Sequence, residues 1–349
     1  MSGSWTDTAA DHSQRPDALS LKRCSVHLIG RAAAPRPVDG SAISPWRQLI
    51  LSTRLACNAG YGQSMSKRPR FPRQWSWPDN GKIAFSVGIP FEAFEKQSQV
   101  NFVAAKGVLD RFSLSYGDYG WKAGIWRLLN LLDEYGLKAS VSANGLAAER
   151  HPDIIRMLAQ DGHEVNGHGW ANDVYAKDAS PELERAEIAR CTKMLTEATG
   201  GVRPVGWTSP GSSGSDFTIE FLAEQGYIWL GDDASDDLPF VQQTKSGPFV
   251  ILPRTNISTN DISAWIFPAN PPSVFFENFT ETFDQLYREG NEGAPKWLSM
   301  TLHAHMAGRP TFASTVRRCL GYVKKHDGVF YTRNRDIAEW TLKNQKATA

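Results

Sequence analysis

The amino-acid sequence predicts an α/β fold, a single β/α barrel of about seven parallel strands. From Lys82 onward, short apolar runs alternate with segments of helical period, which is the pattern of βα units around a parallel sheet. About seven such units can be counted, enough to close or nearly close a barrel. The chain has 349 residues, 41% of them hydrophobic and 21% charged, an ordinary composition for a large globular domain.

The first unit begins with a β-branched run, Ile83–Ile89, which we expect to end in a turn at Pro90. Trp121–Tyr135 places four aliphatic residues on one face, so it predicts an amphipathic helix, closed by Gly136. Ala139–Ser142 is expected to be the next strand.

The next segments follow the same alternation. A helix is predicted over Pro152–Gln160, with Asp161-Gly162 as its turn. Glu164–Asn166 is expected to be a brief strand that leads directly into His168. A long helix is then predicted over Pro181–Thr199.

The remaining elements are shorter strands and longer helices. The expected strands are Pro204–Trp207, Tyr227–Leu230, Phe249–Leu252, Trp297–Leu302 and Val329–Tyr331. The expected helices are Asp216–Gln225, Val274–Glu289 and Thr311–Lys325, and Ile337–Leu342 continues the rhythm. Asp216 is expected near the N-cap of its helix.

Residues 1–64 differ from the rest of the chain. They are rich in Ala, Ser, Arg and Pro, and they contain neither a sustained apolar period nor the continuous hydrophobic region of a secretory signal. We predict that they form a disordered extension, or that they precede a natural start at Met65. A transit peptide is the alternative, although four aspartates in this stretch are unusual for one. The barrel is therefore expected to occupy residues 65–349.

Charge and cysteine content restrict the partners. A net charge of +1 gives no reason to expect nucleic acid or an anionic membrane. The four cysteines are scattered without a CxxC pair, which argues against a cysteine metal cluster and a disulfide scaffold and favours a cytoplasmic location. No stretch of about 18 apolar residues predicts a membrane span. The expected partner is a small-molecule amide substrate. The sequence leaves open whether the chain also forms a homo-oligomer.

Polar and aromatic residues gather where the predicted strands end. They form the segments Pro90-Phe91-Glu92, His168 to Asn172, Trp207 to Gly211 and His303-Ala304-His305, and an acidic cluster of Asp232, Asp233, Asp236 and Asp237. A lone glutamate is usually solvated, and a lone histidine usually packs in the core. Their coincidence at the C-terminal ends of barrel strands predicts an active site instead. His163 is separated from His168 by a strand and is expected to be structural.

These segments resemble motifs of a known family. Gly162 to Trp170 is similar to the "GHEv..HGW" segment of polysaccharide deacetylases, and Leu302-His303 with Gly308-Arg309-Pro310 is similar to their "LH….GRP" segment. Three further stretches resemble the "YE", "D….DDLPy" and "iPyT…TND" segments of the allantoinase-like branch, namely Phe91-Glu92, Asp233 with Asp236 to Phe240, and Leu252 to Thr255 with Thr259-Asn260-Asp261. The resemblance runs from Pro78 to Leu342. It implies a NodB-like barrel that hydrolyses carbon–nitrogen amide bonds.

The resemblance also implies a divalent metal, held by one acid and an H-x-x-x-H pair, with a second acid as base. Here the second position of the pair is Asn172, and the base position is Pro90. An amide oxygen is a poor zinc ligand. We expect either that no cofactor is required or that zinc or manganese is held weakly by Glu92 and His168, with His305 as a candidate third ligand.

In a site without metal, Glu92 is expected to act as general base, provided that burial raises its pKa. His168 and His303 are expected to polarise the carbonyl or protonate the leaving nitrogen. Asn172 and the backbone after Trp207 are expected to stabilise the oxyanion. The predicted substrate contacts are Trp170, Asn172, Trp207, Ser209, Asp233, His305 and Arg309.

Three functions remain open from the sequence. The first is a hydrolase of a small amide, imide or ureide, and the expected substrate is cyclic. Allantoin itself is not favoured, because Ala171-Asn172 and Ser209-Pro210-Gly211 replace the "RW" and "TGR" segments of the allantoinase-like branch. The second is a metal-dependent deacetylase of a polysaccharide or peptidoglycan. The third is an inactive barrel that binds a ligand.

Overall fold

The structure is a computed structural model that describes residues 71, 73–100, 107–254, 257–266 and 269–345. The predicted extension, residues 1–64, lies outside the described residues, so its disorder and the boundary at Met65 stay predictions. Within the described part, no helix is both long enough and apolar enough to cross a membrane.

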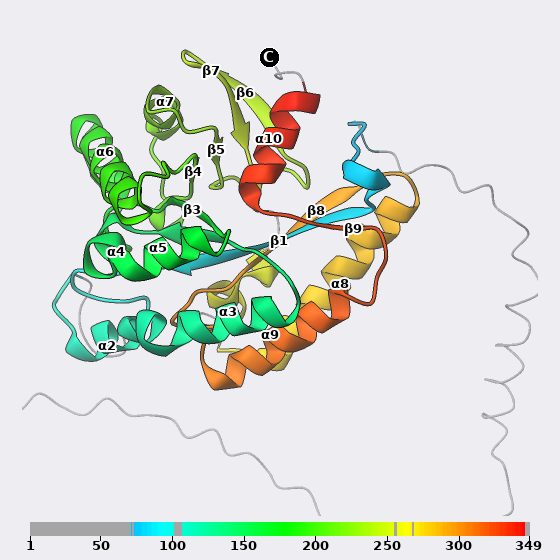
Figure 1. Cartoon of the computed structure of the whole chain (residues 1–349), viewed down its shortest axis with the longest axis horizontal. Coiled ribbons are helices and arrows are strands. Elements are labelled where there is room, and N and C mark those ends of the chain that lie inside the picture. Colours follow the sequence, from blue (N-terminus) through cyan, green and yellow to red (C-terminus); the bar gives the residue numbers. More distant parts are fainter. Residues whose placement is uncertain (1–70, 72, 101–106, 255–256, 267–268, 346–349) are drawn as a thin grey trace, which may run out of the picture. The chain divides into compact units, whose positions relative to one another are not determined.

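A single sheet forms the centre of the described chain, in the order β6-β7-β5-β4-β3-β2-β1-β8, with β9 also paired to β1 (Figure 1). Its strands are β1 (Ile83–Phe91), β2 (Ser140–Ala143), β3 (Glu164–Gly167), β4 (Gly206–Trp207), β5 (Trp229–Leu230), β6 (Phe240–Thr244), β7 (Gly247–Ile251), β8 (Lys296–Thr301) and β9 (Val329–Tyr331). From β7 to β8 every neighbouring pair is parallel. This run confirms the predicted α/β barrel of about seven parallel strands.

The barrel is not fully closed. β6 and β8 are the two ends of the strand order, and β6 is antiparallel to β7. An isolated parallel bridge between Asn260 and Thr301 extends the pairing beyond β8. The sheet therefore curls into a partial barrel, whose strand ends still converge on one side.

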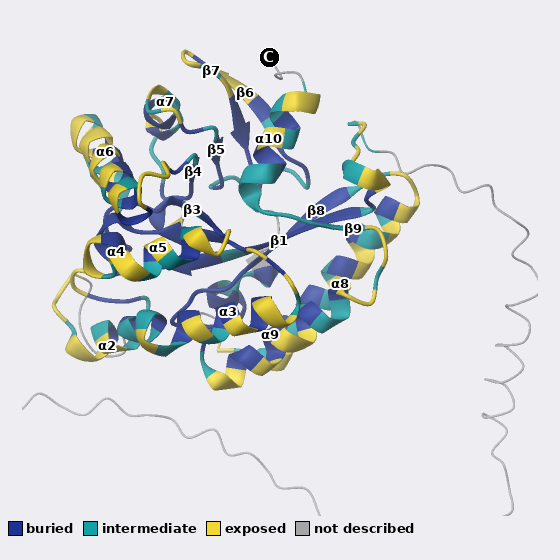
Figure 2. Cartoon of the chain, in the orientation of Figure 1, coloured by how far each residue is buried: buried dark blue, intermediate teal, exposed yellow. Residues whose placement is uncertain are grey.

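Helices cover the outer face of the sheet. They are α2 (Arg111–Tyr119), α3 (Ile125–Glu134), α4 (Gly145–Arg150), α5 (Pro152–Gln160), α6 (Pro181–Ala198), α7 (Thr218–Glu224), α8 (Pro272–Asn291), α9 (Pro310–Val323) and α10 (Asn334–Asn344). Short 3₁₀ turns lie at Pro78–Asn80, Ala176–Asp178, Pro210–Ser212 and Ile257–Thr259, and π turns at Gly120–Gly124 and Ile262–Ile266. Figure 2 shows the central strands buried and the outer helix faces exposed, whereas β9 and the tip of the β6–β7 hairpin are partly exposed.

Local sequence explains where several helices begin. α5, α6, α8 and α9 each start with proline, whose fixed φ suits the first helical turn and whose missing N–H is not needed there. The Ser180 side chain accepts a hydrogen bond from the Leu183 N–H at the start of α6, and the Asp110 carboxylate caps α2 in the same way. Asp216 does not cap α7, because that helix begins at Thr218 after an N-cap without a side-chain bond.

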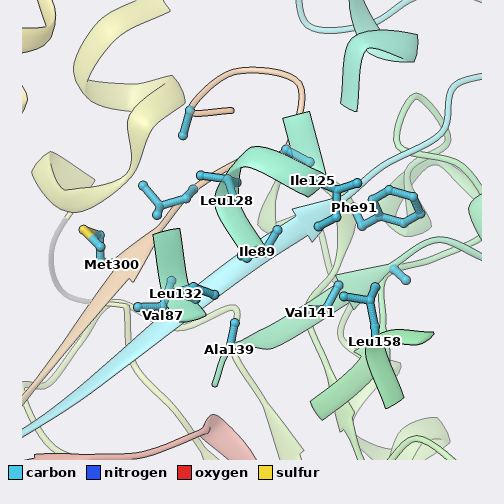
Figure 3. Packing of buried hydrophobic residues seen from close by; sticks show 14 of the residues in the cluster. Val87, Ile89, Phe91, Ile125, Leu128, Leu132, Ala139, Val141, Leu158 and Met300 are labelled. Atoms are coloured by element: carbon cyan, nitrogen blue, oxygen red, sulfur yellow. The ribbon is translucent and has the colours of Figure 1, made fainter. Parts of the chain in front are cut away.

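The two faces of β1 have different chemistry. Its alternate residues from Ile83 to Phe91 are apolar and pack against the helices, where Val87, Ile89 and Phe91 lie close to side chains of α3 (Figure 3). Its other face carries Gly88 and Pro90, which line a cavity inside the barrel together with Ser142, Ser299 and Thr301 from neighbouring strands. The helix-facing side of β1 is therefore apolar, and the cavity on its other side is lined by polar groups together with Leu252 and Trp297.

The predicted turn at Pro90 is wrong. β1 continues through Pro90 to Phe91, in register with Ser142 and Ala143 of β2. Proline removes only a donor from the ladder, and the Pro90 carbonyl still accepts a hydrogen bond from the Ala304 N–H at 3.1 Å. Because β1 ends at Phe91 and not at Ile89, Glu92 directly follows the strand.

Candidate active site

A cavity of about 320 Å³ lies at the C-terminal ends of the parallel strands. Five of the predicted site residues line it: Glu92, His168, Asn172, Ser209 and His303. They follow four different strands, so the barrel brings together side chains that are far apart in the sequence. This grouping agrees with the expectation that the strand ends share one site.

Glu92 occupies the centre of this group, and only 1% of its side chain is exposed. Its Oε1 atom lies 3.4 Å from Nε2 of His168 and 3.6 Å from Nε2 of His303. Its Oε2 atom accepts a hydrogen bond from Nε2 of Gln99 at 2.8 Å and lies 3.7 Å from Nδ1 of His305. The carboxylate is thus held between three imidazoles and an amide.

Both cavity histidines are oriented through their Nδ1 atoms. Nδ1 of His168 lies 2.6 Å from the Thr208 carbonyl, and because a carbonyl only accepts, Nδ1 carries the proton. Nδ1 of His303 lies 2.6 Å from Oδ1 of Asp261, which is fully buried. The Asp261 carboxylate also accepts the backbone N–H groups of His303 and Ala307. Each imidazole therefore directs Nε2 toward Glu92.

The charges of this group are coupled. Burial alone would raise the pKa of the Glu92 carboxyl, but the field of His303 and the hydrogen bond from His168 outweigh it and lower the pKa to about 2. The expectation that burial raises this pKa is therefore wrong. Burial also lowers the pKa of His303, but Asp261 and Glu92 more than offset it and hold that pKa above its ordinary value. Glu92 is an anion at neutral pH, and His303 keeps its proton to higher pH than a free histidine.

His305 lies behind Glu92, outside the cavity wall. Burial lowers its pKa to about 4, so its imidazole is neutral at pH 7. His163 also lies outside the cavity, where Nδ1 accepts the Ala139 N–H at 3.0 Å. That contact agrees with the structural role expected for His163.

Trp170 and Trp207 are not in the cavity wall, contrary to the expectation that they contact substrate. Both belong to the hydrophobic core. Trp170 donates from Nε1 to Glu95, and the Arg190 guanidinium lies 3.1 Å above its ring. Large apolar rings next to the strand ends are buried here by packing, which the sequence pattern did not distinguish from ligand contact.

Asp233 and Arg309 also lie elsewhere. Asp233 accepts hydrogen bonds from Ser235 and lines a separate surface depression. The Arg309 guanidinium lies 3.6 Å from the ring centre of Tyr116 and donates from Nε to the His305 carbonyl at 3.0 Å. Arg309 therefore supports the segment that carries the histidines and does not line the cavity.

The backbone after Trp207 does not provide the expected oxyanion donors. The Thr208 N–H donates to the Gly167 carbonyl at 3.0 Å, and the Ser209 N–H donates to the Asp232 carboxylate at 2.9 Å. These two donors are already used. The Asn172 side chain remains in the wall, and its buried Oδ1 has no partner among the described residues.

The donor set does not fit a resident divalent metal. In the part of the chain that the structure describes, no three His, Cys, Asp or Glu side chains are arranged to hold an ion, and the Nε2 atoms of His168 and His303 are directed at Oε1 of Glu92 itself. Position 172 offers a neutral amide, and Oε2 of Glu92 is already hydrogen-bonded by Gln99. The site therefore offers the chain's own acid and base groups for catalysis.

The sequence predictions missed Gln99 and Arg254, which line the cavity, and Asp261, which is buried behind it and orients His303. Asp261 and Arg254 belong to segments quoted for the family resemblance, yet nothing in their local pattern indicates which side chain turns toward the barrel axis. Gln99 follows Glu92 by seven residues, in a loop without periodicity. Only the folded chain brings these residues to the histidines.

Comparison with known proteins identifies relatives of this fold. The family model described as polysaccharide deacetylase matches residues 112–229. A solved structure described as a probable polysaccharide deacetylase from Pseudomonas aeruginosa PAO1 is 30% identical, with a TM-score of 0.72, covering 79% of this chain and 96% of that one. A solved PuuE allantoinase is also 30% identical, with a TM-score of 0.72, covering 80% of this chain and 96% of that one. A Schizosaccharomyces pombe protein whose description names a polysaccharide deacetylase is 27% identical over 304 residues, which span 77% of this chain and 93% of the relative.

The fold and the site thus define a NodB-like barrel hydrolase that acts on carbon–nitrogen amide bonds other than peptide bonds. The chain belongs to the polysaccharide deacetylase family.

Proposed function

We propose that the protein hydrolyses the amide bond of a small cyclic amide, imide or ureide by attack of water on the carbonyl. One observation carries the proposal: the buried carboxylate of Glu92 lies between the Nε2 atoms of two histidines in the wall of a small cavity. That arrangement places a base and an acid side by side, next to a space that can hold a carbonyl.

Glu92 acts as the base. The Thr208 carbonyl fixes one proton of His168 on Nδ1, so Nε2 is directed at Oε1 of Glu92, 3.4 Å away, and orients this carboxylate. A water beside Oε1 donates a hydrogen bond to it. As the water oxygen forms the new bond to the carbonyl carbon, the water becomes more acidic and its proton passes to the Glu92 carboxylate.

His303 acts as the acid. Asp261 keeps Nδ1 protonated and stabilises the imidazolium, so Nε2 carries a second proton that faces the cavity. When the carbon–nitrogen bond breaks, this proton passes to the leaving nitrogen. The products are a carboxylate and an amine or amide nitrogen, joined in one molecule when the substrate is cyclic.

The size and polarity of the cavity support a small substrate with N–H groups. A volume of about 320 Å³ suits a small molecule better than a polymer chain. The Gln99 side chain donates a hydrogen bond from Nε2 to Glu92. Its own amide oxygen, Oε1 of Gln99, is a buried acceptor without a partner among the described residues. Asn172 offers a second such oxygen. Imides and ureides carry N–H groups beside their carbonyls and would satisfy these acceptors.

Turnover on a matched panel tests the proposal. The panel contains hydantoin, dihydrouracil, succinimide, N-acetylglucosamine oligomers and simple N-acyl amines, each assayed before and after dialysis against a chelator. We expect hydrolysis of cyclic compounds that is unchanged by chelation. Loss of that activity on chelation, with recovery on adding zinc or manganese, would contradict the metal-independent mechanism, and no turnover at all would favour the inactive barrel.

A second cavity favours one alternative. It measures about 480 Å³ and shares Gln99, Asn172 and Tyr175 with the first. An N-acetylated saccharide could extend from one into the other, as a polysaccharide or peptidoglycan deacetylase would need. Preference of the enzyme for the N-acetylglucosamine oligomers in the panel would support this second function over the first.

A further inference from the structure

The cavity wall carries a single lysine or arginine among its described residues, Arg254. Arg254 follows β7, whereas Glu92 follows β1, and four strands lie between them in the sheet. In a curled sheet, strand ends so far apart in the order face each other across the barrel axis. A ligand that reaches Glu92 with one end can therefore reach Arg254 with the other.

Contacts on one side hold Arg254 in place. Its backbone N–H donates to the Asp233 carbonyl at 2.7 Å, and Nη2 donates to Oγ of Ser212. Nη2 also lies 3.7 Å from Oδ1 of Asp232, a loose ion pair. The Asp232 oxygens are already occupied by the Ser209 N–H at 2.9 and 3.1 Å.

These contacts orient the Arg254 guanidinium but leave most of its N–H donors available for a ligand. It carries five N–H donors, and among the described residues only Nη2 has acceptors. About a quarter of the side chain is exposed, since its relative exposure is 26%. A planar fork of this kind binds a carboxylate through two parallel hydrogen bonds, which a lysine cannot do.

We infer that Arg254 anchors a carboxylate of the substrate while Glu92 and His303 act on its amide bond. The inference rests on the proposed function and narrows it to amides that also carry an acid group. Asp232 partly offsets the charge of Arg254, so the site suits one carboxylate and not a polyanion.

Paired ligands test this inference. Hydantoin-5-acetate carries a carboxylate, and the amide of that acid has the same ring without the charge. In the wild type we expect kcat/KM for the acid to exceed that for its amide. Arg254→Gln should lower kcat/KM for the acid by about tenfold to a hundredfold, the usual value of a charge-assisted pair, and leave the neutral amide within about twofold. Arg254→Lys should recover only part of the loss, because it retains the charge without the fork.

Arg317→Gln is the control for loss of a positive charge, because Arg317 pairs with Glu134 at the surface, away from the cavity. Arg317→Gln should leave kcat/KM for both ligands unchanged. Equal kcat/KM for the two ligands in the wild type, or an equal loss for both in Arg254→Gln, would overturn the inference. Calorimetry with hydantoin-5-acetate separates this result from failure of the proposed function. If no ligand is hydrolysed, weaker binding to Arg254→Gln than to the wild type still supports the anchor, and equal binding or none overturns it.

Discussion

The carboxylate of Glu92 is almost completely buried and remains ionised at neutral pH. Buried glutamates are rare in proteins unless a partner compensates their charge. Here the compensation comes from His303, whose own proton is held by Asp261 on the opposite side of the ring. Three side chains from different parts of the chain thus interact electrostatically, and the pKa values of two of them, Glu92 and His303, are shifted from their ordinary values.

Replacing the Glu92 carboxylate should nearly abolish catalysis. Glu92→Gln retains the size of the side chain but removes the proton acceptor, so we expect kcat to fall by about a hundredfold to ten-thousandfold. Because the pKa of Glu92 is lowered to about 2, its ionised form persists throughout the working range. The wild-type rate should therefore show no acid limb from this group near neutral pH.

Steady-state rates between pH 4 and 10, in the wild type and in the variant, check both statements. Glu134→Gln is the control, because that exposed carboxylate pairs with Arg317 at the surface and lines neither cavity. Activity of Glu92→Gln close to that of the wild type would remove Glu92 from the mechanism.

Asp261 should set the alkaline limit of activity. Since Asp261 helps to raise the pKa of His303, Asp261→Asn should lower that pKa. The active form has His303 protonated, and it is lost as pH rises through this pKa. The alkaline limb of kcat/KM should accordingly move to lower pH in Asp261→Asn. A uniform loss of rate with an unmoved limb would mean that Asp261 only supports the fold.

At the level of elements, the sequence predicted most helices and strands to within a few residues. α5 and β9 coincide with the predicted Pro152–Gln160 and Val329–Tyr331. β6 was missed because only two of its five residues are buried, so it has no apolar run to detect. The extension of β1 through Pro90 was missed because the deciding contact, the Ala304 N–H, comes from a distant segment. The site shows the same dependence on contacts between distant segments. Glu92, His168 and His303 follow strands that the sequence predicts, so they could be found. Gln99, Asp261 and Arg254 lie in loops, and only the fold brings them to the site.

A close backbone approach links one helix to the catalytic segment. Gly124, at the end of the π turn before α3, lies so near Ala304 that an added Cβ would be 1.8 Å from the Ala304 carbonyl oxygen. Ala304 stands between His303 and His305. Gly124→Ala should therefore displace this segment, destabilise the fold by about 1–3 kcal/mol and reduce activity beyond the loss of folded protein.

Thermal unfolding and kcat of the folded fraction check this prediction. Gly321→Ala in α9 is the matched control, because its nearest neighbour is the Tyr135 hydroxyl at 3.1 Å, the end of a side chain that can shift. Alanine is also favoured over glycine within a helix, so this control should be neutral or slightly stabilising. Equal behaviour of the two variants would show that the approach at Gly124 does not position the histidines.

At the scale of the whole molecule, function follows from the two faces of one sheet. Odd residues of β1 pack against the helices, while Gly88 and Pro90 on the other face line the cavity, so a shift of one residue would exchange core and site. The β-branched run predicted the strand itself. Which residues line a cavity depends on how far the sheet curls, and no local pattern specifies that.

Truncation tests the limits of the folded unit. Among the described residues, one sheet with its helices encloses the cavity and a hydrophobic core that draws on residues from Trp77 onward. A variant that begins at Met65 should therefore unfold cooperatively at the same temperature as the full chain and retain its kcat/KM on the preferred substrate. Calorimetry and steady-state kinetics of the two proteins, measured side by side, provide the comparison. Aggregation or a broad, non-cooperative transition in the shorter chain would mean that residues 1–64 contribute to the fold, and the domain boundary would have to move toward the N-terminus.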